Sequence, residues 1–259
     1  MQRKDLAPYR EQHDAIRQEY AKQAPGWAAD CFTDHLAWVI GQVDFDPQAE
    51  ALDVAAGTEL LARQLAPHVQ SVVALEFTLE MWAHGAGHEA GNIRFEQGAA
   101  EDMPYSAESF DLIATRFSMH HFQEPSAVLA EIYRVCRAGG PLLLIDIVSP
   151  DDPTPAQRYN HFERLRDATH TTAPASAALD QLVLEASFSV SQKLTREVEM
   201  ALDDWLNFNH PAPDARTTIE HAVQDELNGG DATGMRPYIK EERVKFPHIW
   251  RIILGQKEA

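Results

Sequence analysis

Short apolar runs alternate with helical patterns through the middle of the chain. The apolar runs predict five strands, at 51–55, 71–75, 93–96, 110–115 and 141–148. Residues at helical spacing between these runs predict helices at 60–66, 79–84 and 125–137. Strands that alternate with helices favour a parallel sheet with helices on both faces. The run 142–145 is apolar throughout, as expected for a strand that is buried on both sides.

The two flanks of this alternation predict a helical cover. Apolar positions recur near helical spacing before residue 46, so we expect an N-terminal helical cover at 1–45. After the turn-rich segment 149–155, the predicted elements are helices at 157–166, 202–208 and 219–227 and strands at about 187–194 and 246–255. We therefore expect one domain, with its core at 46–150, further helical cover and the sixth strand at 151–245, and a final strand within 246–259.

Charge and composition exclude several classes of partner. The 259 residues carry a formal net charge of −18, with 40 acidic and 22 basic residues and no dense basic block. Such a surface repels the phosphates of nucleic acids, although the charge is explained most simply by solubility. No apolar run approaches the roughly 20 residues that span a bilayer, and the first residues lack a hydrophobic signal core. A cytoplasmic monomer or homodimer with reduced Cys31 and Cys136 is expected.

The segment 51–59, taken together with Glu76, predicts a nucleoside pocket. Small residues at 55–57 permit a tight turn after the first strand, and the following helix start offers unpaired N–H groups. Glu76 ends the second strand, where a carboxylate can accept hydrogen bonds from both ribose hydroxyls. The simpler interpretation of Glu76 is a solvated acid at the end of a strand. The combination with the small-residue turn favours the pocket.

Glu59 argues against a dinucleotide cofactor. The full G-x-G-x-x-G pattern is absent, and Glu59 falls in the first turn of the predicted helix. A negative side chain there opposes a pyrophosphate and is compatible with a cationic or zwitterionic ligand. A nicotinamide oxidoreductase is therefore disfavoured.

Several segments resemble one enzyme family. Residues 52–58, LDVAAGT, resemble motif I of the class I S-adenosylmethionine-dependent methyltransferases. Residues 97–105 resemble the adenine-side loop of that family, and residues 109–113 resemble its fourth strand. Residues 118–122, SMHHF, and 129–140 are similar to the small-molecule branch that includes the ubiquinone and menaquinone methyltransferases. The match covers 45–150, and residues 164–170 also resemble a segment of uncharacterised members.

The resemblance implies a fold and a set of binding residues. The fold is a doubly wound, Rossmann-like α/β sheet of seven strands in the order 3-2-1-4-5-7-6, with the last strand antiparallel. The implied cofactor is S-adenosylmethionine, with S-adenosylhomocysteine as product. The residues implied on its methionine side are Asp53, Ala55, Gly57 and Glu59. Those implied at the ribose and adenine are Glu76, Phe77, Met81, Ala99, Ala100 and Glu101. Those implied at the sulfonium are Arg116 and Phe117.

Two histidines are candidate catalytic bases. His120 and His121 follow the fourth strand, where an imidazole can remove a proton from an acceptor hydroxyl or acidic carbon. The alternative for either residue is that it packs against or caps the next helix. The other histidines are scattered and lack metal-ligand spacing, so no metal is expected. An acceptor pocket is one interpretation of a set of aromatic residues, although such residues more often belong to the core or to helix packing: Trp27, Phe32, Trp38, Trp205 and Phe208.

The expected function is methyl transfer from S-adenosylmethionine to an oxygen, carbon or nitrogen of a small organic acceptor, an activity of the EC 2.1.1 class. A second hypothesis is a methyltransferase-like protein without methyl transfer, acting as a cyclase, a lyase or a ligand-binding protein. Two residues favour the second hypothesis. Glu59 replaces the last glycine of the motif, and Ala99 stands where an acid or amide is common.

Overall fold

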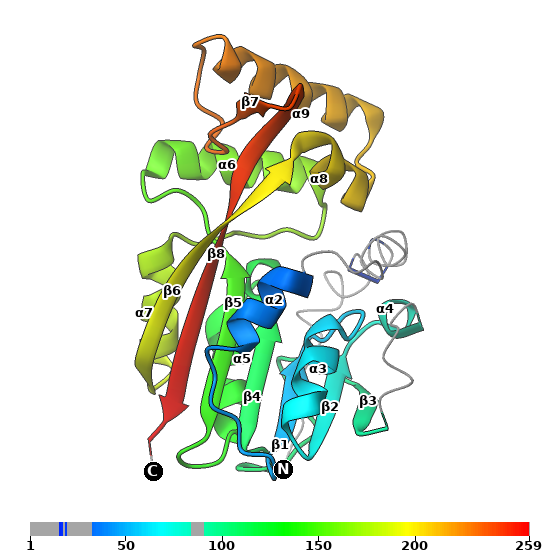
Figure 1. The fold of residues 1–259 in the computed structure, drawn as a ribbon, viewed down its shortest axis with the longest axis vertical. Coiled ribbons are helices and arrows are strands. Elements are labelled where there is room, and N and C mark those ends of the chain that lie inside the picture. Colours follow the sequence, from blue (N-terminus) through cyan, green and yellow to red (C-terminus); the bar gives the residue numbers. More distant parts are fainter. Residues whose placement is uncertain (1–15, 18, 20–32, 84–90, 259) are drawn as a thin grey trace.

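A mostly parallel sheet forms the centre of the protein. The computed structural model describes residues 16, 17, 19, 33–83 and 91–258. The strands are β1 Glu50–Val54, β2 Ser71–Glu76, β3 Ile93–Gln97, β4 Leu112–Arg116, β5 Pro141–Ile147, β6 Phe188–Ala201, β7 Tyr238–Lys240 and β8 Arg243–Lys257. Their order is β3-β2-β1-β4-β5-β8-β6, and the short β7 pairs with β8 (Figure 1). This confirms the predicted order, with β8 as the antiparallel strand and β7 as an addition.

The topology positions a crevice at one edge of the sheet. Within the sheet, the chain runs from β1 outward through β2 to β3 and then crosses back to β4 on the other side of β1. The pairs among β1 to β5 are parallel, whereas β8 runs antiparallel to both β5 and β6. Ligands of doubly wound sheets bind beyond the carboxyl ends of the strands at this change of direction. Here the crevice lies beyond β1 and β4.

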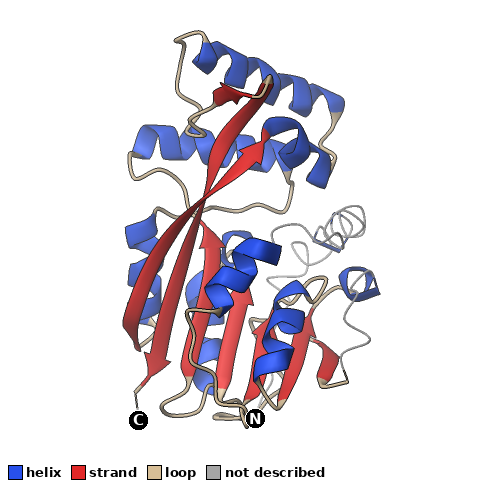
Figure 2. Ribbon diagram, in the orientation of Figure 1, coloured by secondary structure: helices blue, strands red, loops and turns tan. Residues whose placement is uncertain are grey.

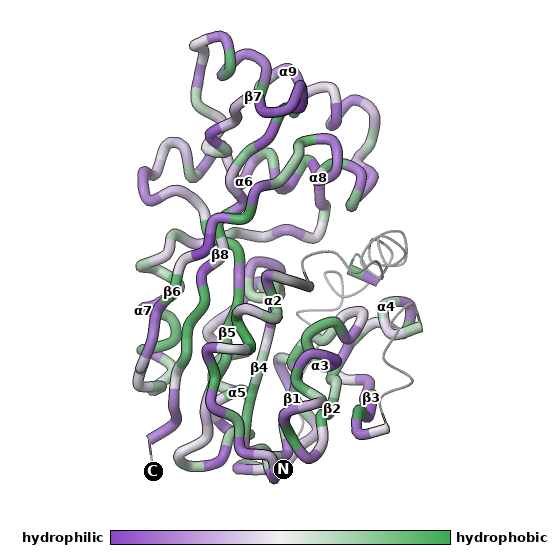
Figure 3. Tube along the Cα trace, in the orientation of Figure 1, coloured by the Kyte–Doolittle hydropathy of each residue, from purple (hydrophilic) through white to green (hydrophobic). Residues whose placement is uncertain are grey.

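Helices cover both faces of the sheet (Figure 2). The helices are α2 Thr33–Ile40, α3 Leu60–Leu65, α4 Leu79–Ala83, α5 Pro125–Val135, α6 Pro153–Arg166, α7 Ser176–Glu185, α8 Leu202–Asn209 and α9 Pro213–Leu227, with short 3-10 turns η2 Ala66–His68 and η4 Met119–His121. One hydrophobic core packs α2 and α3 against the sheet, and the other packs α5 and α7 against the opposite face. Leu143 and Ile145 belong to the first core, while Leu142 and Leu144 belong to the second. This burial on both faces explains the continuous apolar run of β5, which is green in Figure 3.

The last two long strands differ from the prediction. β6 continues to Ala201 instead of ending near residue 194, and β8 spans 243–257 instead of 246–255. Exposed and half-buried positions alternate along most of β6, because it is an edge strand with one face toward solvent. The polar residues at 195–197 therefore do not end the strand, although in the sequence they resemble a loop.

The two strands carry a cap beyond the sheet. β6 pairs with β8 from Phe188 and Lys257 to Ala201 and Lys245, and the cap elements α6, α8, α9 and β7 lie around the far end of this ribbon (Figure 1). Helix α6 begins at Pro153, earlier than predicted, because Asp152 accepts a hydrogen bond from the backbone N–H of Thr154 at 3.0 Å. The prediction missed α7 altogether.

Parts of the predicted N-terminal cover lie outside the described residues. These parts include Cys31 and the aromatic residues Trp27 and Phe32.

Cys136 is a buried free thiol whose pKa is raised to about 11 by burial. Among the described residues, no helix is long and apolar enough to cross a membrane.

Candidate active site

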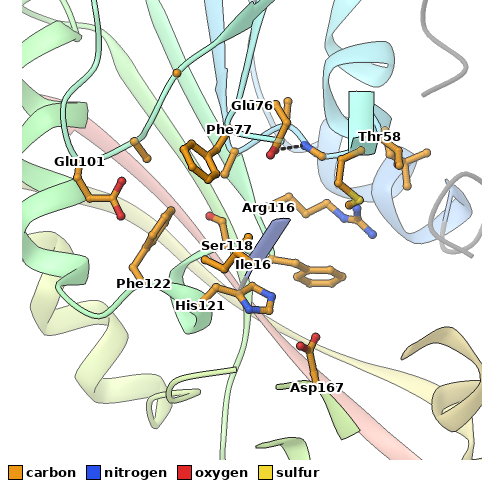
Figure 4. Close-up of a pocket in the computed structure, with 18 residues that line it drawn as sticks. Ile16, Thr58, Glu76, Phe77, Glu101, Arg116, Ser118, His121, Phe122 and Asp167 are labelled. Atoms are coloured by element: carbon orange, nitrogen blue, oxygen red, sulfur yellow. Dashed lines mark hydrogen bonds between the residues drawn. The ribbon is translucent and has the colours of Figure 1, made fainter. Parts of the chain in front are cut away.

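A cavity opens at the predicted crevice beyond the carboxyl ends of the parallel strands. Its empty volume is about 960 Å³ including the open mouth, which is the size of a small-molecule site. The residues that line it come from the loops after β1, β2, β3 and β4, from the N-terminal segment and from the cap (Figure 4). They are Ile16, Ala55, Ala56, Gly57, Thr58, Leu60, Glu76, Phe77, Met81, Gly98, Ala100, Glu101, Arg116, Phe117, Ser118, His121, Phe122 and Asp167.

Glu76 holds the turn after β1 and also faces the cavity. Its Oε2 accepts a hydrogen bond from the backbone N–H of Gly57 at 2.8 Å (Figure 4). Its Oε1 accepts from the backbone N–H and the hydroxyl of Thr78, both at 2.8 Å. Burial raises the pKa of Glu76, and these hydrogen bonds oppose that rise. The backbone of Phe77 also hydrogen-bonds to this carboxylate, which faces the cavity as part of its lining.

The surroundings of Glu76 fit a nucleoside. Gly57 has a φ of +57°, which favours glycine, and its conformation turns the backbone N–H toward Glu76. Phe77 and Met81 add apolar surface to the lining. At Gly98, which lines the cavity, an added Cβ would lie 2.7 Å from Cδ1 of the core residue Leu75, so the backbone of the lining packs closely on the core there. A carboxylate beside flat apolar walls matches a ribose joined to an aromatic base.

Nine of the twelve predicted cofactor residues line this cavity, and three do not. The exceptions are Asp53, Glu59 and Ala99, all of which are buried. Glu59 was expected in the first turn of a helix, but it is the N-cap residue of α3, with a φ of 60°. Its side chain is outside the lining, so the expectation that it meets an anion or the cofactor directly has no support in the geometry.

Asp53 lies behind the wall of the cavity. Burial raises its pKa to about 8, an effect that Arg116 opposes and that the acids Glu76 and Glu59 reinforce. Its Oδ2 has no hydrogen-bond partner among the residues described. The guanidinium of Arg116 lies 4.3 Å from the centre of the Phe117 ring, and both residues line the cavity.

The two adjacent histidines have different surroundings. His120 is buried outside the lining, and its Nδ1 lies 2.5 Å from Oδ1 of Asp146, the second-last residue of β5. Asp146 also accepts hydrogen bonds from the backbone N–H groups of Met119 and Ile147, each at 2.7 Å. Burial holds the pKa of His120 well below its usual value, so the ring is neutral. His120 therefore fastens η4 to the sheet.

His121 lines the cavity instead. Its Nδ1 lies 3.0 Å from the hydroxyl and 3.2 Å from the carbonyl oxygen of Thr169. In Figure 4 its ring lies between Ser118 and Asp167, at the end of the cavity opposite Glu76. Of the two predicted catalytic histidines, the structure brings His121 to the cavity.

The sequence prediction missed the cap's contribution to this end. Asp167 follows α6 and lines the cavity, and neither its position nor that of Thr169 follows from the pattern of apolar residues. The available signal was the resemblance of residues 164–170 to members of the family. Of the aromatic residues considered for an acceptor pocket, Trp38, Trp205 and Phe208 are outside the described lining, where Phe117 and Phe122 lie instead. Trp205 is a core residue of the cap.

Groups of three or more His, Cys, Asp or Glu side chains arranged for a metal ion are absent from the described part of the chain. The ring centre of His120 lies 4.1 Å from that of His121 and 5.3 Å from that of His170, and both pairs of rings are tilted. These rings are held by hydrogen bonds to Asp146, Thr169 and Asn160. The three histidines are therefore held together by ring packing and by these hydrogen bonds.

A doubly wound sheet with a nucleoside-sized cavity at its change of direction defines a Rossmann-like protein of the kind that binds a nucleoside cofactor. A family model described as a methyltransferase domain matches residues 52–144. The chain belongs to the S-adenosylmethionine-dependent methyltransferases, and S-adenosylmethionine is the cofactor of that family. The predicted family is thereby confirmed.

Individual relatives support this assignment. The uncharacterized methyltransferase YcgJ of Bacillus subtilis is 29% identical over 210 residues, 72% of this chain and 81% of YcgJ. Its solved structure superposes with a TM-score of 0.79 and 24% identity, covering 87% of this chain and 99% of YcgJ. The uncharacterized protein YafE of Escherichia coli is 31% identical over 145 residues, 54% of this chain and 70% of YafE. The ubiquinone/menaquinone biosynthesis C-methyltransferase UbiE of Geotalea daltonii is 30% identical over 121 residues, 44% of this chain and 52% of UbiE.

Two variants of Glu59 will show whether its backbone is strained. At a φ of 60°, alanine keeps the steric cost of the left-handed region and glycine does not. Since both changes remove the same carboxylate, we expect Glu59→Gly to be more stable than Glu59→Ala by about 1 kcal/mol in denaturant unfolding. An alanine variant as stable as the glycine variant would show that the left-handed conformation carries no cost.

The buried Asp53 predicts a pH-dependent difference in stability. Its pKa is about 8 in the folded protein and 3.8 in an exposed chain, so the folded state holds an extra proton between these values. This group therefore makes the wild type lose stability as the pH rises from about 4 to about 8. Asp53→Asn removes that loss. We expect the stability of the variant relative to wild type to be greater at pH 9 than at pH 5, measured by urea unfolding, and an unchanged difference would contradict the raised pKa.

Proposed function

We propose that the protein transfers a methyl group from S-adenosylmethionine to an oxygen, carbon or nitrogen of a small organic acceptor. One observation carries the proposal. A single cavity has a carboxylate suited to a ribose at one end, Glu76, and a candidate base at the other, His121. A nucleoside cofactor and an acceptor can therefore occupy the same cavity.

The residues at the nucleoside end support the proposal of this cofactor. Glu76 would bind the ribose hydroxyls, Phe77 and Met81 would pack near the adenine, and Ala100 and Glu101 would meet its edge. When bound, S-adenosylmethionine supplies an electrophilic methyl group. The acidic surroundings of the cavity favour such a cationic cofactor over a pyrophosphate.

The acceptor end combines apolar surface with two polar groups. Phe117 and Phe122 offer flat apolar walls, and Asp167 and His121 offer a carboxylate and an imidazole. His121 would take the proton that the acceptor atom loses. The cap contributes the wall that carries Asp167 and so shields this end from water, and the main catalytic effect would be the relative positioning of the reactants.

The alternative without methyl transfer receives no support from the lining. It was based on Glu59 and Ala99, and neither residue lines the cavity. The small size of the acceptor, the cytoplasmic location and a monomeric or homodimeric state remain predictions from the sequence.

Calorimetry tests the proposal directly. We expect both S-adenosylmethionine and S-adenosylhomocysteine to bind the purified full chain. Glu76→Gln should weaken the affinity about 10- to 100-fold, because hydrogen bonds to a charged group contribute roughly 1.5–3 kcal/mol.

The matched control is Glu80→Gln, which removes an equal charge from the exposed surface of α4, four residues away. This variant should bind like the wild type. If neither ligand binds at millimolar concentration, the proposed function is wrong. If both variants weaken binding equally, the effect is one of general charge, and Glu76 has no specific role.

A further inference from the structure

The loop after α6 is fastened to the turn that carries His121. The backbone N–H of Thr171 donates to the carbonyl oxygen of His120 at 2.9 Å, and its hydroxyl donates to the same oxygen at 2.7 Å. The carbonyl oxygen of Phe122 lies 3.0 Å from the same hydroxyl, so its single hydrogen is shared between two carbonyl oxygens. The cap and the sheet therefore hold Asp167, Thr169 and His121 in one arrangement.

A chain of hydrogen bonds runs from Asp167 through Thr169 to His121. Oδ1 of Asp167 accepts from the backbone N–H of Thr169 at 2.9 Å and from its hydroxyl at 2.6 Å. Oδ2 accepts from the side-chain amide of Asn209 at 2.6 Å. Burial raises the pKa of Asp167, but nearby His121 and Arg166 and the two hydrogen bonds from Thr169 outweigh burial and lower that pKa to about 2. The carboxylate is therefore ionised at neutral pH.

The donors and acceptors in this chain of hydrogen bonds determine which ring nitrogen of His121 carries the hydrogen. An ionised carboxylate can only accept, so the hydroxyl of Thr169 must donate to Asp167. The lone pairs of that hydroxyl remain for Nδ1 of His121, and the nearby carbonyl oxygen of Thr169 is also an acceptor. Nδ1 must therefore carry the hydrogen. In the neutral ring, Nε2 is then the basic nitrogen.

We propose that Thr169 and Asp167 are positioning residues that hold His121 as the Nδ1–H tautomer, with Nε2 as the general base of the reaction. This inference rests on the proposed function and names its acceptor class, a molecule whose reacting atom carries a proton. That proton moves to Nε2. The electron pair it leaves on the acceptor atom forms the bond to the methyl carbon, and the pair of the broken carbon–sulfur bond stays on sulfur.

The same chain stabilises the product of proton transfer. An imidazolium at His121 donates from Nδ1 to Thr169, whose hydroxyl donates to the negative charge of Asp167. The charge is thus balanced through one intervening hydroxyl. His120 lacks this arrangement, because its partner Asp146 is buried in β5 and neither residue lines the cavity.

Nuclear magnetic resonance of the full chain labelled with ¹⁵N-histidine tests the tautomer without an acceptor. His121→Gln identifies the signals of His121. We expect the neutral ring of the wild type to carry its hydrogen on Nδ1 alone. Thr169→Val keeps the shape of the side chain and removes the hydroxyl, so the Nε2–H form should become populated. Thr169→Ser retains the hydroxyl and should keep the wild-type tautomer.

A wild-type ring that carries its hydrogen on Nε2 would overturn the proposal, as would a valine variant with the tautomer of the wild type. If Thr169→Val does not fold, as judged by its backbone amide spectrum, the wild-type tautomer and the serine variant still decide the matter. Calorimetric binding of S-adenosylmethionine is a separate measurement. Its failure would remove the proposed function, whereas a wrong tautomer would remove the positioning role alone.

Discussion

The pairing of β8 with both of its neighbours is the interaction on which the site depends. β5 pairs with β8 over Trp250 to Gln256, whereas β6 pairs with it from Lys257 back to Lys245. The first part of β8 therefore extends past the end of β5 with β6 as its long partner. Backbone hydrogen bonds hold this two-stranded extension, and the cap helices pack around it (Figure 1). The loop with Asp167 is therefore supported from two sides, by the cap that packs on this extension and by the hydrogen bonds of Thr171 to the turn that carries His121.

Buried charges fix the cap in one orientation. Glu163 is fully buried and forms an ion pair with Arg166 at 2.8 Å, and the guanidinium of Arg166 also donates to the side-chain oxygen of Asn209. Asn209 in turn donates to Asp167 at the cavity. Each of these groups is expensive to bury without its partner. Because the network links α6 to α8 and ends at the cavity, a shift of the cap that separated its members would leave charges without compensation.

The sequence predicts the parallel core well and the cap poorly, for one physical reason. Strands buried on both faces are apolar throughout, as at 142–145, and their ends are marked by small residues such as Gly57. The cap has no such pattern. β6 alternates polar and apolar positions at an edge, and α7 has no strong signal at its ends. Asp167 and Thr169 reach the cavity through tertiary contacts that local periodicity does not encode. The resemblance of residues 164–170 to family members gave the one indication of their importance.

Glu59 belongs to the motif in the sequence, but in the structure it is not part of the cavity lining. In the sequence it occupies the place where the motif has glycine, and the φ of 60° shows why glycine suits that place. Its side chain nevertheless avoids the cavity and adds its charge to a group that includes Asp53, Glu76 and Arg116. Arg116 opposes the rise in the pKa of Asp53, Glu76 and Glu59 reinforce it, and the proton retained by Asp53 relieves part of the repulsion among these acids. A pyrophosphate would add further negative charge beside this group, whereas a cationic cofactor would reduce the imbalance. The electrostatic field of the buried acids therefore disfavours a dinucleotide, although Glu59 does not line the cavity. This effect does not require direct contact with the ligand.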